Sequence, residues 1–395
     1  MASLRSLGGG APPVASPPVN YDLTDEQDLV RQTVRDFALS RVAPVAEELD
    51  RDERFPYEIV AGLAELGLMG IPIPEEYGGA GADTLSYAIA IEELTRIDSS
   101  VAITVAAHTS LGTMPIYLFG DDAQKQEWLP SLASGKKLAA FGLTEAGAGS
   151  DAGATRTRAE LHDGEWVVNG SKIFITNAGT DITACVTITA LTGDGEVSNL
   201  IVPNGTAGYD ISTPMHKLGW HASDTRELSF KDCRVPEGNL LGGRGKGFQQ
   251  FMEILDGGRI SVASMGVGLA QGAYDLAFAY AQERQQFGRP ISKFQAIQFQ
   301  LADLATEIEA GRQLVYRAAW LKDQGKPFAL AAAQAKLYTG LLSNRAVNSA
   351  LQIHGGYGFM NEYAISRLYR DQKILEIGEG TNEIQRLVIA KLLGL

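Results

Sequence analysis

Residues 141–151 read FGLTEAGAGSD, and the sequence changes character on either side of this stretch. Before it, apolar residues recur at helical spacing, whereas after it short apolar runs alternate with Gly, Asn and Asp turns as far as Leu240. Long helical periods return between Phe248 and Leu393. The sequence therefore predicts a mainly α protein with a central β-domain.

The part before this stretch begins with a helix start signal. Thr24 followed by Gln27 forms a capping-box pattern, and apolar residues then recur on one face. Further helices are expected near residues 57–66, 85–98 and 123–132. Residues 1–20 are rich in Ala, Gly, Pro and Ser, and we expect this tail to be disordered.

The middle part contains strand candidates at residues 166–168, 172–176, 186–188 and 227–230, with a spacing that favours a small barrel or sandwich. Helices long enough for a bundle follow at 268–285, 295–322 and 328–351. The predicted domains are therefore an N-terminal helical domain at 21–138, a middle β-domain at 139–245 and a C-terminal helical bundle at 246–395.

Charge and residue content argue against several functional classes. The 395-residue chain has a net charge of −13, which disfavours a nucleic-acid partner because phosphate binding needs a basic surface. The five histidines form no ligand cluster with Cys185 and Cys233, so no metal site is expected. The two cysteines fit a reduced, intracellular setting, although a single disulfide stays open as an alternative.

Targeting signals are also weak in this sequence. No long apolar run is evident, so we expect no membrane span, and no apolar region follows Arg5 as a secretory signal would require. We expect a bacterial-type cytoplasmic location, with the mitochondrial matrix as the minor alternative.

Three segments that can carry chemistry are rich in glycine. In residues 141–151, glycines allow backbone N–H groups to approach a ligand, or they simply form a loop. QIHGGYGF at 352–359 allows a ligand or a second subunit to approach closely, and His354 there fits a helix end as well as a base. IGEGTNEIQR at 377–386 places Glu379 between two glycines, where a substrate could lie on the carboxylate; an exposed surface turn is the alternative.

Two further segments combine an aromatic residue with a polar one. FITNAG at 174–179 indicates a strand whose terminal hydroxyl, on Thr176, could address a flat heterocycle; a half-buried strand is the alternative. ERQQFG at 283–288 ends a helix, where Arg284 could pair with a diphosphate or stabilise the helix C-terminus.

Together, and in this order, the five segments resemble the motifs of the acyl-CoA dehydrogenase family. TEAGAGSD is similar to that family's TEPGAGSD loop, with Ala146 where proline is usual. FITNAG resembles its WITN motif, ERQQFG its R-x-x-FG motif, QIHGGYGF its GG-x-GF motif and EGTNEIQR its EGT-x-x-IQR terminus. LTDEQ near residue 23 matches the usual family start, so the resemblance extends from about Tyr21 to the last residue.

The resemblance implies an acyl-CoA dehydrogenase-like fold, with a β-barrel-like middle domain and a C-terminal four-helix bundle, and it implies FAD as the cofactor. The implied FAD contacts are Phe141, Leu143, Thr144, Ser150, Phe174, Ile175, Thr176, Arg284, Phe287, Gln295, Gln352, Gly355, Gly356, Thr381 and Glu383. Gln352, Gly355 and Gly356 would be reached from a neighbouring subunit. The implied substrate contacts are Ser150, Asp256, Arg259, Gly378 and Gly380.

The resemblance also implies a reaction and a base. The family removes a proton from the carbon next to a thioester and a hydride from the following carbon, so a carboxylate must take the proton and the flavin the hydride. Glu379 matches the family's base. A minority of the family places its base in the segment that is LDGGRI here, where Gly258 offers no carboxylate; Glu376 lies outside the Gly-Glu-Gly turn.

The expected partners and substrate follow from the same resemblance. We expect a homotetramer that oxidises an acyl-CoA and passes electrons to an electron-transfer flavoprotein. The alternatives are an acyl-CoA oxidase, which usually carries a further C-terminal domain after the EGT helix, and a non-catalytic relative that binds acyl-CoA or flavin. Gly378 stands where many straight-chain enzymes have tyrosine, and Leu143 adds an apolar wall, so a short or methyl-branched acyl group is expected.

Overall fold

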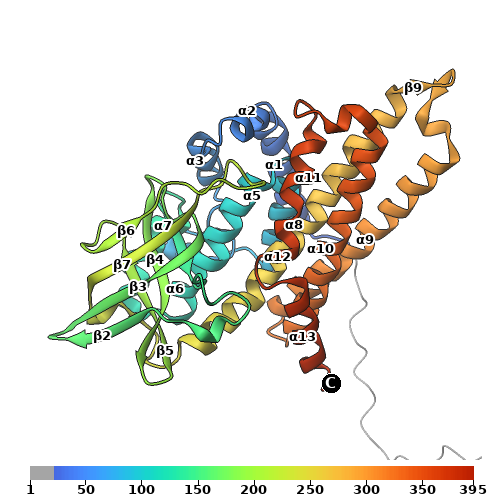
Figure 1. Ribbon diagram of the computed structural model, residues 1–395. Coiled ribbons are helices and arrows are strands. Elements are labelled where there is room, and N and C mark those ends of the chain that lie inside the picture. Colours follow the sequence, from blue (N-terminus) through green and yellow to red (C-terminus); the bar gives the residue numbers. More distant parts are fainter. Residues whose placement is uncertain (1–21) are drawn as a thin grey trace, which may run out of the picture.

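The computed structural model describes residues 22–395, and the predicted N-terminal tail lies outside these residues. The chain forms helices, then a sheet, then helices again (Figure 1). The N-terminal helices are α1 (Asp25–Phe37), α2 (Ala46–Arg51), α3 (Tyr57–Glu65), α4 (Thr84–Ile97), α5 (Ser99–Ala106), α6 (Met114–Phe119) and α7 (Asp122–Ala133), with the π-helical segments η1 (Ala38–Val42) and η3 (Ala107–Thr113) between them.

The start signal at Thr24 is confirmed by the geometry of α1. The Gln27 backbone N–H donates to the Thr24 hydroxyl at 3.2 Å, and the Thr24 backbone N–H donates to the Gln27 side chain at 3.0 Å. The predicted helices at 57–66, 85–98 and 123–132 correspond to α3, α4 and α7.

The middle region is an eight-stranded sheet with the order β6-β7-β3-β2-β4-β5-β8, and β1 pairs in parallel with β4. Its strands are β1 (Leu138–Gly142), β2 (Arg158–His162), β3 (Glu165–Thr176), β4 (Thr183–Gly193), β5 (Glu196–Pro203), β6 (Tyr209–Ile211), β7 (Thr225–Pro236) and β8 (Leu240–Leu241). The two strands predicted at 166–168 and 172–176 are one strand, β3. Its pairing with β7 shifts register between Lys172 and Ile175, which is where Phe174 turns outward.

The C-terminal region is built on three long helices, α8 (Gly247–Glu283), α9 (Gln295–Asp323) and α10 (Ala329–His354). The short helices α11 (Ala364–Gln372), α12 (Ile374–Ile377) and α13 (Asn382–Leu392) follow, and α10 packs against α8, α9, α11 and α13. A small hairpin, β9 (Gln285–Gln286) and β10 (Arg289–Pro290), projects beyond the end of α8 (Figure 1).

Helix α8 begins 21 residues before the predicted start at residue 268. Its glycines lower helix propensity, which is why sequence analysis did not predict the first part of the helix. Close packing explains two of them, since a Cβ on Gly268 would lie 2.3 Å from the Glu92 carbonyl oxygen and one on Gly272 would lie 2.2 Å from that of Arg96. These glycines let α8 pack directly against α4.

One large hydrophobic cluster joins the N-terminal and C-terminal helices, and a second fills the sheet domain. The helical stretch Ser99–Phe119 is long and apolar enough to span a membrane, contrary to the expectation that no such run exists, but 83% of its most apolar window is buried in the protein. Buried core helices share this composition, so one such stretch is weak support for a membrane span.

Candidate active site

Glu379 lies in a tight turn between α12 and α13. Its φ angle is 56° and that of Gly380 is 84°, so two consecutive residues adopt a left-handed conformation. Such a backbone is strained for glutamate and persists only where the surroundings impose it. A Cβ at position 380 would lie 2.8 Å from the Gln385 side-chain nitrogen, and together with the positive φ angle this favours glycine there.

The carboxyl group of Glu379 is partly withdrawn from solvent. Its Oε2 atom is buried and has no hydrogen-bond partner. Burial raises the pKa of this carboxyl to about 7, although Arg259 and Lys336 oppose the shift. A base whose pKa lies near neutrality suits proton abstraction at physiological pH.

Helix α8 approaches this carboxyl closely because Gly258 has no side chain. A Cβ at Gly258 would lie 2.8 Å from Oε2 of Glu379. No carboxylate competes from that position. Glu376 accepts hydrogen bonds from Gln372 and Asn344, which outweigh burial and lower its pKa. Glu376 is therefore a structural residue, and Glu379 is the candidate base.

The glycine-rich loop is anchored by Glu145, which sequence analysis did not single out. Its carboxylate accepts hydrogen bonds from the Thr155 hydroxyl at 2.6 Å, the Arg156 backbone N–H at 2.7 Å and the Lys172 ammonium at 2.7 Å. Burial opposes its ionisation, but the bonds from Lys172 and Thr155 hold the pKa of Glu145 down to about 2. Burial lowers the pKa of Lys172 to about 8. This buried pair fixes the loop that carries Leu143 and Thr144.

The rest of the loop leaves room for a ligand. A Cβ at Gly147 or Gly149 would meet nothing within 4 Å, and Ser150 is exposed. Leu143 and Thr144 are half-buried, whereas Phe141 is buried against Phe251 and Ile254. The loop can therefore offer backbone groups and small side chains to a flat cofactor, with Phe141 acting as support from behind.

The FITNAG segment presents an uncovered aromatic ring. Phe174 has a φ angle of 63° and is 62% exposed, a combination that costs free energy unless another group covers the ring. Thr176 is half-buried at the end of β3. Ile175 is only 3% exposed and belongs to the sheet core, so only its backbone could face a cofactor. These features fit a flavin ring lying on Phe174.

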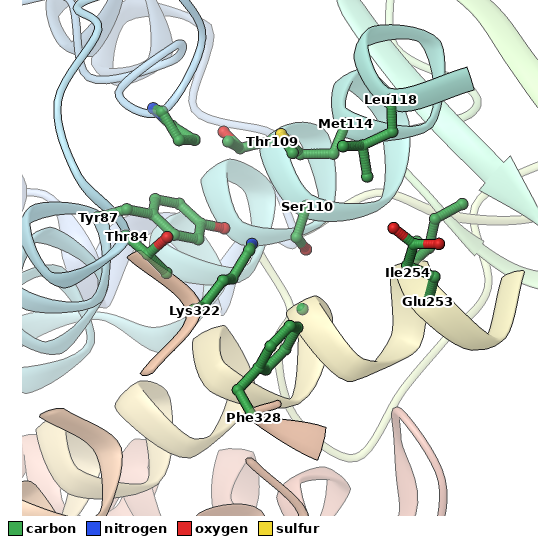
Figure 2. A pocket seen from close by; sticks show the side chains of 12 residues that line it. Thr84, Tyr87, Thr109, Ser110, Met114, Leu118, Glu253, Ile254, Lys322 and Phe328 are labelled. Carbon is green, nitrogen blue, oxygen red and sulfur yellow. The ribbon is translucent and has the colours of Figure 1, made fainter. Parts of the chain in front are cut away.

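A small cavity of about 90 Å³ is lined by residues of α4, η3, α6, α8 and α9 (Figure 2). Figure 2 shows Tyr87 from α4, Ser110 from η3, Lys322 from α9 and Phe328 around a common space. The Tyr87 hydroxyl donates to the Ala106 carbonyl at 3.1 Å. Gly257, the neighbour of Gly258, also lines the cavity. Sequence analysis missed Tyr87, because a tyrosine on a helix face does not differ from a core residue by pattern alone.

The predicted substrate contacts, and the predicted FAD contacts Thr381 and Glu383 beside them, are not equally accessible. Arg259 is 2% exposed and forms an ion pair with Asp256, which is half-buried. Ser150 is exposed, and Gly378 and Gly380 flank Glu379 in its turn. Thr381 caps α13 by accepting a hydrogen bond from the Ile384 backbone N–H, and Glu383 is exposed beside Arg386.

A second group of predicted cofactor residues gathers at the far end of α8. Arg284 stacks over the Tyr357 ring at 5.3 Å, and both residues line a groove with Gly355 and Gly356. Phe287 in the hairpin is 94% exposed with a φ angle of 52°. Gln352 and Gln295 are exposed. Within residues 22–395, no carboxylate forms an ion pair with Arg284.

The structure thus divides the predicted cofactor residues into two groups. Gly258, beside Glu379, and Arg284 are separated by about 39 Å along α8 at 1.5 Å per residue. The Arg284 group therefore lies far from the Glu379 turn along α8.

The residues described, 22–395, contain no group of three or more His, Cys, Asp or Glu side chains that could hold a metal ion. Cys185 and Cys233 are buried and unpaired.

The chain is similar to many known proteins along nearly its whole length. A probable acyl-CoA dehydrogenase, YngJ, from Bacillus subtilis is 53% identical over 95% of this chain and 100% of its own length. A short-chain-specific acyl-CoA dehydrogenase from Clostridium acetobutylicum is 46% identical over 94% of this chain and 99% of its own.

Solved structures are also similar to nearly the whole of this chain. One chain comes from a solved structure described as the electron transferring flavoprotein of Acidaminococcus fermentans. It superposes with a TM-score of 0.93 at 44% identity, covering 95% of this chain and 99% of that one. An acyl-CoA dehydrogenase complexed with FAD from Bacillus anthracis superposes with a TM-score of 0.90 at 37% identity, covering 94% of this chain and 68% of that one.

Three family models match in succession. They describe the acyl-CoA dehydrogenase N-terminal domain at residues 24–136, the middle domain at 140–233 and the C-terminal domain at 245–394. This match and the relatives above show that the chain belongs to the acyl-CoA dehydrogenase family.

Proposed function

We propose that this protein dehydrogenates a short or methyl-branched acyl-CoA to the trans-2-enoyl-CoA, with Glu379 as the base that takes the α-proton. Acyl-CoA dehydrogenases are FAD-dependent, and FAD supplies the hydride acceptor. The observation that carries the proposal is the buried, unpartnered Oε2 atom of Glu379, together with a carboxyl pKa raised by burial to about 7, which suits a base at neutral pH.

The residues of the chain act by positioning and by charge. Phe174 would cover one face of the flavin ring, and the Thr144 and Thr176 hydroxyls would address its edge, since all three are at least partly accessible beside the glycine-rich loop. The carboxylate of Glu379 would accept the α-proton once the thioester lies against the Gly378–Gly380 turn. Arg259 and Lys336 stabilise the ionised form of that carboxylate before the proton is taken.

The expected acyl group follows from the space around Glu379. A tyrosine at position 378 would add a phenol ring at the mouth of the turn, whereas Gly378 leaves its Cβ position 3.4 Å from the nearest backbone atom. The cavity that Gly257 lines is small, at about 90 Å³. A relative that is 46% identical is named as short-chain specific. A short acyl group, with room for a methyl branch, fits these features.

The group at Arg284 lies about 39 Å along α8 from Gly258 beside the Glu379 turn, and this separation favours an oligomer. We expect a second copy to bring its Gln352, Gly355 and Gly356 to the FAD of the first, in a homotetramer. The long helices α9 and α10 provide faces for such contacts. A similar solved chain is described with an electron transferring flavoprotein, which supports an acceptor of that kind. The cytoplasmic location stays a prediction.

Anaerobic addition of an acyl-CoA panel to the purified, FAD-loaded protein tests the proposal. Butyryl-CoA, isobutyryl-CoA and isovaleryl-CoA should bleach the oxidised flavin absorbance, and a C12 acyl-CoA should bleach it far more slowly. No bleaching by any acyl-CoA would indicate a non-catalytic relative. Rapid hydrogen peroxide formation in air would indicate an oxidase instead.

Gly378→Tyr sharpens the substrate assignment. The added ring should slow bleaching by the branched substrates about 10-fold more than bleaching by butyryl-CoA, because small differences in an apolar pocket change selectivity by this order. Equal losses on both kinds of substrate would show that Gly378 does not shape the acyl pocket.

A further inference from the structure

We propose that Lys336 is a positioning residue that keeps a positive charge beside the Glu379 turn and so holds the base ready in its ionised form. This inference rests on the proposed role of Glu379 as base. Lys336 is on α10, more than forty residues before the turn in sequence, and no motif of the family resemblance includes it.

The geometry places the Lys336 ammonium directly against the turn. Lys336 is 1% exposed, and its Nζ donates to the Gly380 carbonyl oxygen at 2.8 Å. The Lys336 Nζ also lies 3.5 Å from the Asn382 side-chain oxygen. Within the described part of the chain, no carboxylate lies within 4.0 Å of this ammonium as an ion-pair partner. A buried cation without a paired anion is unfavourable for stability, so folding alone does not explain its presence.

The hydrogen bond of Lys336 is not the only one that holds the turn. The Gln385 side-chain N–H groups donate to the Glu379 carbonyl at 3.2 Å and to the Gly380 carbonyl at 2.9 Å. Gln385 is fully buried, and so its amide is protected from water. The turn therefore keeps a donor for both carbonyls without Lys336, and what Lys336 alone adds is its charge.

The charged groups that face Glu379 show why this charge matters. Arg259 approaches from α8 and Lys336 from α10, while Tyr87 on α4 is a neutral phenol. The guanidinium of Arg259 forms an ion pair with Asp256 and also favours the ionised form of Glu379. Lys336 has no such pair, and its strongest electrostatic partner is Glu379. Burial lowers the pKa of Lys336 to about 8, so the group is still charged at neutral pH.

The test is the pH dependence of kcat/KM for butyryl-CoA, measured on FAD-loaded protein with an artificial electron acceptor. Lys336→Met has a similar volume and no charge. The acid limb of its pH profile, where kcat/KM falls as the pH is lowered, should move to higher pH by about one unit, because an opposite charge that favoured the carboxylate is lost. Activity at pH 6 should fall about tenfold more than activity at pH 8.5. Lys336→Arg should keep the limb of the parent.

Lys373→Met is the matched control. Lys373 lies six residues before Glu379, is half-exposed and pairs with Glu376 at 3.3 Å. Its charge is screened by water, so removing it should leave the acid limb in place. If Lys336→Met does not fold, Lys336→Gln retains a donor for Gly380 without the charge and should show the same shift.

An unshifted acid limb in Lys336→Met or Lys336→Gln, with lowered thermal stability or FAD content, would overturn the inference and leave Lys336 a purely structural role. Glu379→Gln separates this outcome from a failure of the proposed function. If Glu379→Gln retains the turnover of the parent, the assignment of the base is wrong; if it is inactive while the Lys336 variants keep the parental limb, only the inference fails.

Discussion

The Glu379 turn and the Arg284 end of α8 differ in how complete they are within one chain. At the turn, buried groups from α8, α10 and α13 surround Glu379, and the backbone carbonyls of Glu379 and Gly380 are hydrogen-bonded. At the other end, Phe287 is almost fully exposed, the groove beside Gly355 is open, and Arg284 pairs with no carboxylate within residues 22–395.

This contrast separates the two requirements of the reaction. The base must have a fixed position and a raised pKa, and both come from burial inside one subunit. The outer part of the cofactor needs positive charge and close backbone approach, which an open surface can offer to a ligand shared with a second copy. Changes at the turn should therefore affect chemistry, and changes at the far end should affect cofactor retention.

The largest expected effect is at the turn. Glu379→Gln replaces the base by an amide of nearly the same shape that cannot accept the proton, so turnover should fall on the order of 10³-fold. FAD content, measured by visible absorbance, and thermal stability should remain close to those of the parent. Turnover within a few-fold of the parent would remove Glu379 from its proposed role.

A smaller effect is expected at the far end. Arg284→Ala removes a charge that would pair with the FAD diphosphate, so FAD should dissociate about 10- to 100-fold more readily on dilution. Turnover with saturating FAD should change little. Arg289→Ala is the matched control, since Arg289 lies in the hairpin that follows Arg284 and stacks on Phe294 at 4.4 Å. Full FAD retention in Arg284→Ala would contradict the division between the two regions.

Sequence analysis predicted the parts that depend on local pattern. The capping box at Thr24 and the order of helices, sheet and helices followed from periodicity and turn residues. Glu379 was singled out by its flanking glycines and by the family motif. The structure adds that these glycines accommodate two left-handed residues and the Gln385 side chain.

The missed residues are those whose role depends on distant packing. Lys336, Tyr87 and the pair of Glu145 with Lys172 act through contacts between elements far apart in the sequence. No local pattern distinguishes a lysine that is buried against a turn from one on the surface of a helix. The side chain of Ile175 likewise points into the sheet core, because β3 alternates its faces there.

The central claim, that burial prepares Glu379 as the base, is tested most directly by the pH dependence of kcat/KM of the unmodified protein. This quantity reports the pKa of the essential base in the free enzyme. A raised pKa means that the group is protonated and inactive at low pH, so the rate should fall tenfold per pH unit below a limb near pH 7. A limb near pH 4.5, or a rate that stays constant from pH 5 to 8, would contradict the account.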